Sequence, residues 1–504
     1  MSFRSSRVIL VHLACAFFLT LFSVPANAAE LLPTPDSPTI NLWKQFAVIC
    51  TLPRLSGKEE PVRQYIRDLA EKKGLRWRQD SVGNLLISVP PTPGKKQLPV
   101  LILHSHLDMV GDKLAGSSHD FSRDPISCVR DGDWLTASGT TLGADNGIGV
   151  AAMLALLDEP DLSHGPLQLL FTVDEEGGFT GADGVDPAFL NAPRLLNLDS
   201  EESHEFNIGC AGGVTHRTVF SFETGPAPSG WVPLRLNISG LTGGHSGVEI
   251  HHGRANAIRL LARLLMALRG QSAYRIGSLK SGTFDTTIPR EAEALVWVPA
   301  LRFPKLIDQL NRQAAIFRHE YQLTDPDMII GSRLSAEKSL NRMVWPVSIS
   351  SGLPTFLLAI PAGVRVMSSE FPGLVETSAN PGVLESEPGQ LILSSHLQSS
   401  SLLAISHLGA RIARLAKPLG GICTEIVPYT PWKPATGSPF VQHAVKIHHQ
   451  LFSAPPRLKV VHAGLECGSF ARINPQLDML SFGPAITGAH TPGERVSIDR
   501  KSVV

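Results

Sequence analysis

The sequence predicts an α/β protein in which a second domain, of α+β type, is inserted into the first. In the first part of the chain, short stretches of consecutive apolar residues alternate with helical segments, which is typical of a mixed sheet covered by helices on both faces. After Gly212–Gly213 the pattern changes to strand-helix-strand successions, which favour helices on one face of an antiparallel sheet. The length of 504 residues, at roughly 150 residues per domain, predicts about three domains or two large ones.

The outer domain is expected to comprise residues 40–213 and 430–504, and it begins with helices and a hairpin. Ser56 and Glu59 have capping-box spacing, which predicts the start of a helix that stops at Gly74. In chain order we expect helices over 42–50 and 56–73, strands over 77–80 and 85–89 around a Gly83–Asn84 turn, a strand over 100–103, a helix over 150–157, and strands over 167–173 and 195–198.

The inserted domain is expected to comprise residues 214–429. The periodicity predicts strands over 232–238, 292–298, 391–393 and 422–427, and helices over 255–268, 305–318 and 402–415. The chain then returns to the outer domain with a helix over 440–451 and a strand over 479–482.

The N-terminal segment has the pattern of a signal peptide. Arg4 and Arg7 precede an apolar run over 8–24, and Ala26-Asn27-Ala28 resembles a cleavage site. This pattern predicts a signal peptide over 1–28 and an exported protein, periplasmic or secreted; the alternative is an uncleaved anchor. No later stretch is apolar enough to span a membrane, so we expect no stable membrane association once the segment is removed.

Charge and cysteine content exclude two classes of protein. The 45 basic and 45 acidic residues cancel, which argues against a partner held through nucleic-acid phosphates. Outside the N-terminal segment there are five cysteines with no CxxC spacing, so neither a disulfide framework nor a thiolate zinc site is expected. Cys467 is a weak candidate nucleophile, because no neighbouring base and orienting group accompany it in a recognised order.

Acidic and imidazole side chains recur where apolar strands end or a helix begins. They are His106 and Asp108, Asp145, Glu175 and Glu176, and Asp199, and His490 after the last strand is the candidate for a further imidazole. Ligand crevices of open α/β sheets lie outside the carboxyl ends of the strands, so these groups should converge there. Their donor atoms suit zinc or a similar divalent ion.

Each of these residues also has a purely structural interpretation. Asp145 is placed where a helix N-cap would be. Glu175–Glu176 could form a solvated turn, and His106 could be a histidine of the core. For any one of them the structural interpretation is favoured, but it explains the recurrence at several strand ends much less well.

Four longer motifs resemble a known enzyme family. They are His106-Leu107-Asp108-Met109-Val110, Gly139 to Gly149 (GTTLGADNGIG), Thr242 to Gly247 (TGGHSG) and His462 to Gly468 (HAGLECG). The sequence is similar to the aminoacyl-histidine (Xaa-His) dipeptidases, also called cytosol non-specific dipeptidases, of the dizinc aminoacylase-like exopeptidases. The resemblance extends from about Leu42 to about Ile498.

The resemblance implies a zinc-exopeptidase-like catalytic domain interrupted by a lid domain that also forms a homodimer. It implies two Zn²⁺ per chain, with Co²⁺ or Mn²⁺ as substitutes. It assigns His106 and Asp199 to one ion, Glu176 and His490 to the other, and Asp145, with a cis bond to Asn146, to both. Asp108 would orient His106, Glu175 would be the general base, His245 would stabilise the oxyanion, and Glu466 would line the substrate pocket or belong to a packing loop.

The expected activity is hydrolysis of unblocked dipeptides, with Xaa-His among the candidate substrates. The alternative is the same dizinc chemistry on an N-acyl amino acid. An inactive binding relative is disfavoured, because Glu175 is kept beside Glu176. The chain lacks an Arg that relatives carry near Gln398, and it has Thr286 where they tend to have Asn. We therefore expect its substrate specificity to differ from theirs.

Overall fold

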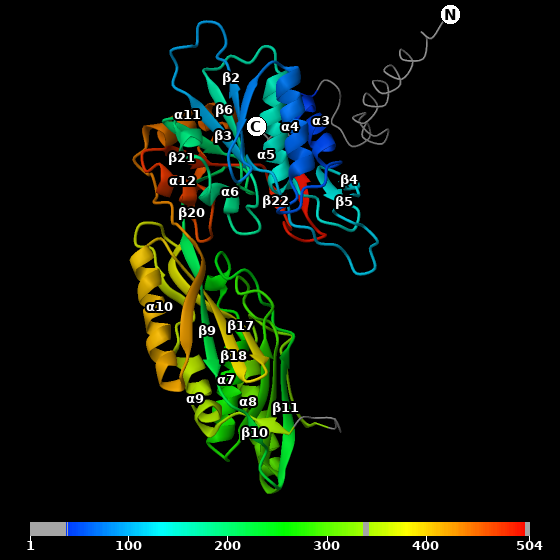
Figure 1. Cartoon of the computed structure of the whole chain (residues 1–504), viewed down its shortest axis with the longest axis vertical. Helices are drawn as coiled ribbons and strands as arrows, with labels where there is room; N and C mark the ends of the chain where they lie inside the picture. The colour runs from blue at the N-terminus through cyan, green and yellow to red at the C-terminus, as the bar shows by residue number, and fades with distance from the viewer. Residues whose placement is uncertain (1–36, 38, 336–341, 499–504) are drawn as a thin grey trace, which may run out of the picture. The chain divides into compact units, whose positions relative to one another are not determined.

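The computed structural model describes residues 37, 39–335 and 342–498, and the chain divides into two units (Figure 1). The first comprises the described residues up to Ile208, Ala435–Lys459 and those from Ser469 onward, and the second comprises Gly209–Pro434 and Val460–Gly468. The segment expected to be a signal peptide lies outside the described residues. Among the described residues, no helix has the length and apolar content needed to cross a bilayer.

The first unit is built on an eight-stranded sheet in the order β1-β2-β6-β3-β7-β21-β8-β20. The strands are β1 (Arg76–Gln79), β2 (Leu85–Val89), β3 (Leu101–His106), β6 (Leu167–Thr172), β7 (Arg194–Asn197), β8 (Glu205–Cys210), β20 (Arg457–Val461) and β21 (Asp478–Ser481). Neighbours among β6, β3, β7 and β21 are parallel, whereas β1, β2 and β6 pair antiparallel. The carboxyl ends of the central parallel strands therefore meet at one edge of the sheet.

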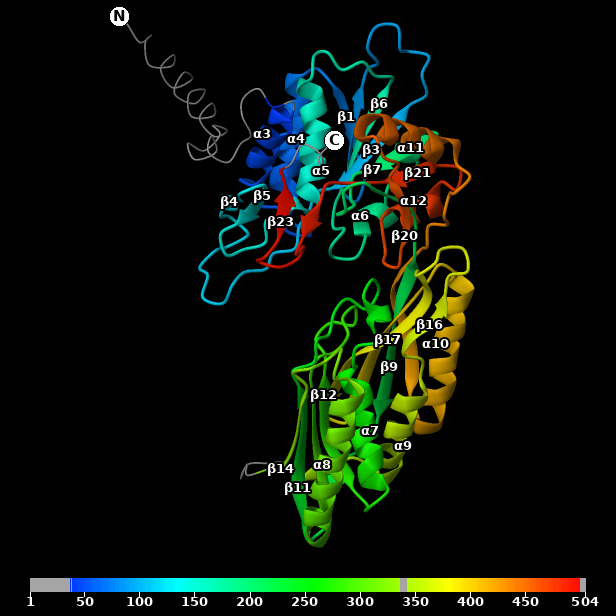
Figure 2. The ribbon, with the colours of Figure 1, turned by 180° about the vertical axis from the view of Figure 1, so that it is seen from behind.

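Helices cover both faces of this sheet, as predicted. Figures 1 and 2 show α3 (Ile40–Ile49), α4 (Glu60–Lys72) and α5 (Ala144–Ala155) on one side and α11 (Pro439–Phe452) on the other. Apolar residues of α4 and α5 pack with those of β2, β3 and β6 in one buried core. The shorter helices are α6 (Thr180–Asp183) and α12 (Cys467–Ile473).

A small four-stranded sheet, not foreseen from the sequence, joins the end of the chain to its first part. It contains β4 (Cys128–Asp131), β5 (Trp134–Ala137), β22 (Ile486–Thr487) and β23 (Arg495–Ser497) in the order β22-β23-β5-β4. Residues of β5 and β23 share a buried core with α3 and α5. The loop between β22 and β23, which carries His490, is thereby held close to α5.

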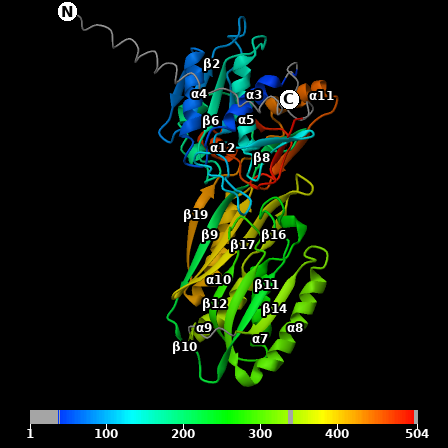
Figure 3. The same cartoon turned by 90° about the vertical axis from the view of Figure 1, so that its right-hand side faces the viewer.

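The second unit is a nine-stranded sheet with four helices packed on it (Figure 3). Its strands are β9 (Gly212–Ser221), β11 (Trp231–Ser239), β12 (Arg275–Ser281), β13 (Ala292–Pro299), β14 (Ile329–Leu334), β16 (Gly363–Met367), β17 (Val375–Glu387), β18 (Gln390–Ser399) and β19 (Ile422–Tyr429), with a separate pair β10 (Gly225–Pro226) and β15 (Met343–Val344). Its helices are α7 (Ala257–Arg269), α8 (Phe303–Glu320), α9 (Val347–Ala359) and α10 (Leu402–Ala416). All four helices contribute to a single core with the sheet.

Two local differences from the sequence-based expectations have clear physical reasons. The strand β17 is missing from the expected elements because buried polar residues such as Thr377, Ser378 and Asn380 interrupt its apolar pattern. Glu59, not Ser56, is the N-cap of α4, and the Ser56 hydroxyl instead donates to Asp108 at 2.7 Å. The assignment of the two units as catalytic domain and lid stays a prediction.

Candidate active site

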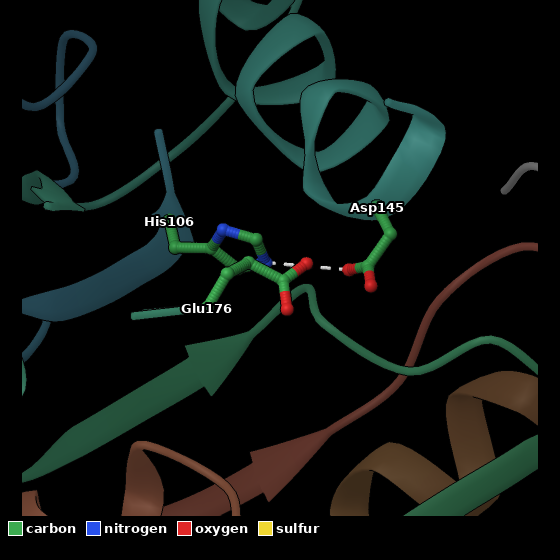
Figure 4. Close-up of side chains that lie close together, drawn as sticks. All are labelled: His106, Asp145 and Glu176. Carbon is green, nitrogen blue, oxygen red and sulfur yellow. Dashed lines mark hydrogen bonds and ion pairs between the residues drawn. The ribbon is translucent and has the colours of Figure 1, made fainter. Parts of the chain in front are cut away.

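Asp145, at the start of α5, has each carboxylate oxygen directed at a different histidine. Its Oδ1 lies 3.2 Å from Nε2 of His106, and its Oδ2 lies 3.1 Å from Nε2 of His490. The bond between Asp145 and Asn146 is cis, as the resemblance implied. Figure 4 shows Asp145 facing His106, with Glu176 beside them.

A second carboxylate accompanies each of these histidines. Asp199, two residues after the end of β7, has Oδ1 3.2 Å from Nε2 of His106, and Glu176, after the end of β6, has Oε1 2.9 Å from Nε2 of His490. Two groups of donor atoms, each with one imidazole nitrogen and two carboxylate oxygens, therefore share Asp145. In each group the nitrogen nearest the carboxylates is Nε2.

These side chains are able to hold a metal ion. The ligand atoms of His106, Asp145 and Glu176 all lie within 4.8 Å of one another. Imidazole nitrogen and carboxylate oxygen are the donors that zinc and similar divalent ions take in proteins. The donor set thus fits the metal dependence that the sequence suggested, without identifying the metal.

The electrostatics of the group call for added positive charge. Burial raises the pKa of Glu176, and the charge of Asp145 raises it further. Burial alone would lower the pKa of His490, but its hydrogen bonds to Asp145 and Glu176 raise that pKa to about 11. The pKa of His106 is likewise raised against the effect of burial, chiefly by Asp199. The carboxylates of Asp145, Glu176 and Asp199 outnumber the imidazoles of His106 and His490. Protonated histidines alone therefore do not neutralise the negative charge of the group, whereas divalent cations would.

Asp108 is fully buried and orients both the histidine and the acidic turn. Its Oδ1 lies 3.3 Å from Nδ1 of His106 and accepts the backbone N–H of Glu175 at 3.0 Å. Its Oδ2 accepts the backbone N–H of Glu176, also at 3.0 Å. Although burial opposes ionisation, these contacts hold the pKa of Asp108 below its usual value. Asp108 thus links the end of β3 to the end of β6.

Asn146 supports the site in a way that the sequence did not reveal. Its Nδ2 donates to the carbonyl oxygen of Leu198 at 2.8 Å and to Oδ1 of Asp199, while its Oδ1 accepts from the hydroxyl of Ser105. The side chain of Asn146 therefore orients Asp199 from the start of α5. Its position directly after Asp145 was the only signal available.

His245 and Glu466 belong to the second unit. Nδ1 of His245 accepts the backbone N–H groups of Gly247 at 3.0 Å and Val248 at 3.2 Å, so the ring proton is on Nε2. Glu466 is fully buried, and its place in a substrate pocket stays a prediction. Cys467 is fully buried as well, which disfavours it as a nucleophile.

The two positions at which the sequence predicts a difference in specificity, Gln398 and Thr286, also lie in the second unit. Gln398 is buried, and its Nε2 donates to the hydroxyl of Tyr429 at 2.9 Å. Thr286 is exposed, and its carbonyl oxygen accepts the backbone N–H of Ser246 at 2.8 Å. The effect of these differences on specificity stays a prediction.

Comparisons with known proteins give relatives over nearly the whole chain. The cytosol non-specific dipeptidase of Escherichia coli (strain K12) is 36% identical over 479 residues, which cover 94% of this chain and 96% of that protein. The crystal structure of aminoacylhistidine dipeptidase from Vibrio alginolyticus has a TM-score of 0.79 at 36% identity and covers the same shares of the two chains. Aminopeptidase PepT from Bacillus cereus ATCC 10987 has a TM-score of 0.51 at 14% identity, covering 91% of this chain and 93% of its own, which is a likeness of fold alone.

These comparisons overturn the expectation of an exported protein. The Escherichia coli relative, which matches 94% of this chain, is by its name an enzyme of the cytosol, and this contradicts the predicted periplasmic or secreted location and the signal peptide on which it rested. The prediction used a pair of arginines followed by an apolar run. Such a run is a local compositional pattern in residues 1–28, and it is independent of the similarity to this relative in the rest of the chain.

The family is shown by a match that extends over most of the chain. The model of the peptidase family M20/M25/M40 matches residues 102–502, a range that includes Asp145, Glu176, Asp199 and His490. The predicted α/β fold class and the predicted relationship to the dipeptidases are confirmed by this match together with the two relatives at 36% identity. This chain belongs to the peptidase family M20/M25/M40.

Proposed function

We propose that this chain is a metal-dependent dipeptidase that hydrolyses unblocked dipeptides with two zinc ions. The observation that carries the proposal is the orientation of Asp145, whose two carboxylate oxygens face two separate pairs of imidazole and carboxylate. His106 and Asp199 would hold one ion, Glu176 and His490 the other, and Asp145 both. The two relatives at 36% identity, which are dipeptidases by name, support the substrate class.

The residues of the chain would divide the chemistry among them. Bound divalent ions would polarise the scissile carbonyl and lower the pKa of the attacking water. Glu175, whose backbone is held by Asp108, would take a proton from that water and deliver it to the leaving amine. Asp108 would keep the ring of His106 in the tautomer that directs Nε2 to the metal.

His245 would stabilise the negative charge that develops on the carbonyl oxygen. The support for this role is its tautomer, because two backbone N–H groups donate to Nδ1 and leave the ring proton on Nε2. A neutral imidazole with a fixed N–H is a suitable donor to an oxyanion. The same loop of the second unit holds this histidine through Glu249, which accepts its backbone N–H at 2.8 Å.

The second unit would also form the interface of a homodimer. Support comes from β19, an edge strand of the nine-stranded sheet, on which Ile422, Ile426 and Val427 are exposed, and from α10 next to it, where Leu402 and Leu403 are exposed. An exposed edge strand with apolar side chains is a surface that proteins normally pair or cover. If this edge is the interface, the Ile426→Lys variant should sediment as a monomer.

Metal analysis combined with a substrate panel tests the proposed activity. The purified protein should cleave dipeptides that have a free α-amine, chelator should abolish the activity, and Zn²⁺, Co²⁺ or Mn²⁺ should restore it. The Asp145→Ala variant is the matched control and should bind neither ion. Full activity in metal-free protein would contradict the metal site, and cleavage of N-acyl amino acids in place of free dipeptides would identify a deacylase.

A further inference from the structure

Glu494 is a buried carboxylate that lies four residues after His490 and is 2% exposed. Its Oε2 accepts the backbone N–H groups of Leu142 and Gly143, both at 2.8 Å. Its Oε1 accepts those of Ala144 at 2.7 Å and of Asp145 at 3.2 Å. One side chain thus satisfies four successive backbone donors at the start of α5, including the donor of Asp145 itself.

A buried cation contacts the same segment from its carbonyl side. The guanidinium group of Arg54, 2% exposed, donates to the carbonyl oxygens of Leu107 at 3.0 Å, of Asp108 at 2.9 Å and of Gly143. Arg54 therefore connects the segment that follows His106 to the segment that precedes Asp145. We call Glu494 and Arg54 together the clamp.

The segment 142–145, which lies between Glu494 and Arg54 of the clamp, has almost no room to shift. Gly143 adopts φ +70°, and a Cβ atom there would lie 2.4 Å from Nη2 of Arg54 and 2.7 Å from Sδ of Met109. The first N–H groups of a helix have no partner within the helix, and a buried helix start needs an acceptor for them. A carboxylate supplies two acceptor oxygens and a negative charge that complements the positive end of the helix dipole.

We propose that Glu494 is a positioning residue that sets the loop carrying His490 against the segment carrying Asp145. Because Glu494 and His490 share one short loop, the four backbone contacts hold that loop in register with the start of α5. The register directs Oδ1 of Asp145 at His106 and Oδ2 at His490. This inference rests on the metal site of the proposed function and extends it to a residue that touches neither substrate nor metal.

A carboxylate of the same kind elsewhere in the first unit provides the comparison. Oδ1 of Asp80 accepts the backbone N–H groups of Val82, Gly83 and Asn84 at 2.9–3.2 Å, in the turn between β1 and β2. Asp80 shapes a turn and has no contact with the proposed ligands. Substitution of Asp80 therefore measures what the loss of a backbone-binding carboxylate does to the fold alone.

The test compares Glu494→Gln with Asp80→Asn in metal-free protein titrated with Co²⁺. The amide NH₂ of glutamine cannot accept hydrogen bonds, so two of the four backbone N–H groups that Glu494 now binds lose their acceptor. Loss of a residue that orients a ligand typically lowers metal affinity 10- to 100-fold. We expect that loss, a changed Co²⁺ absorption spectrum and faster hydrogen exchange over residues 142–145 in Glu494→Gln. We expect none of these in Asp80→Asn, and activity of Glu494→Gln should recover at high metal concentration.

The outcomes separate this inference from the proposed function. If the wild-type protein binds no Co²⁺, the metal site itself is contradicted, and the inference falls with it. If the wild type binds Co²⁺ and Glu494→Gln binds it with the same affinity and spectrum, the inference alone is overturned, as it is if Asp80→Asn weakens binding equally. Should Glu494→Gln not fold, Glu494→Asp decides: the shorter carboxylate should bind Co²⁺ more weakly than wild type, and unchanged binding would overturn the inference.

Discussion

Glu175 and Glu176 are adjacent in the chain, but their environments suit different tasks. The carboxylate of Glu176 contacts His490 within the group of candidate ligands, whereas Glu175 has its backbone N–H fixed by Asp108 and is proposed as the base. The turn that contains both residues is stabilised by two hydrogen bonds, which their backbone N–H groups donate to the carboxylate of Asp108. This arrangement makes the pair a sensitive test of the proposed roles.

We predict opposite results from the two isosteric substitutions. Glu175→Gln should keep both metals and lower kcat by about 10²-fold or more, which is the usual cost of losing a general base. Glu176→Gln should lose occupancy at one metal site, because an amide oxygen is a weaker ligand than a carboxylate. Metal content by elemental analysis and kcat on one dipeptide measure both effects. Equal metal loss in the two variants would refute the assignment.

At the scale of the element, α5 depends on a close approach to the ends of β3 and β7. A Cβ atom at Gly149 would lie 2.0 Å from Oδ1 of Asn146, 2.8 Å from Oγ of Ser105 and 3.0 Å from the carbonyl oxygen of Leu198. The absence of a side chain at Gly149 thus lets Asn146 reach Asp199. The packing at the start of α5 and the geometry of the candidate metal site therefore depend on each other.

We predict that Gly149→Ala lowers both stability and metal content. Overpacking of this kind costs about 1–3 kcal/mol, and displacement of Asn146 removes the partner that orients Asp199. Denaturant unfolding and elemental analysis check the two effects. Gly331→Ala in β14 is the control, because a Cβ atom there meets nothing within 4 Å. A Gly149→Ala protein with normal zinc would show that this approach does not matter to the site.

At the scale of the whole molecule, His245 and the candidate metal ligands belong to different units of the chain. An oxyanion donor on a separate unit must be brought to the metals by domain closure or by a partner chain. We predict that His245→Ala retains its metals and its stability and loses about 10²- to 10³-fold in kcat. Activity near that of the wild type would remove His245 from the mechanism.

Mixing two inactive variants distinguishes the two routes. If His245 acts in trans, a heterodimer of His245→Ala and Glu175→Gln contains one complete site, and activity should return once subunits exchange. Exchange is verified first with labelled chains. No recovery after verified exchange would mean that His245 serves its own chain.

The stability of the second unit should fall in mild acid. Burial lowers the pKa of His396 and of His462 to about 4, against about 6.5 in an unfolded chain. Above pH 6.5 both states are neutral at these residues. As the pH falls from about 6.5 towards 4, only the unfolded chain gains the protons, so each histidine removes about 1.4 kcal/mol per pH unit.

Denaturant unfolding of the second unit at pH 7 and pH 5 measures this loss. His462→Gln should reduce the pH dependence, since glutamine does not titrate and can still bond to the Ser378 hydroxyl, which lies 2.8 Å from Nε2 of His462. An unchanged pH dependence in a His396→Gln, His462→Gln double variant would contradict the prediction.

Much of the fold could be predicted because its signals are local. The apolar runs of β3, β6 and β7 and the periodicity of α7 and α10 are properties of short segments. The side chains near the ends of those strands were identified as candidates for the same reason, since His106, Glu176 and Asp199 lie at or close to the ends of apolar runs. The polar strand β17 and the small sheet of β4, β5, β22 and β23 lacked such signals, because their formation depends on partners distant in the chain.

The sequence by itself determined which side chains are available at the ends of the strands and to which peptidase family they are related. The tertiary structure decided how they are used. It showed that Asp145 faces two histidines at once, that Ser56 bonds to Asp108 instead of capping a helix, and that Glu494 holds the backbone of Asp145. Such contacts join segments up to 349 residues apart, and their geometry depends on packing between those segments, which no local pattern encodes.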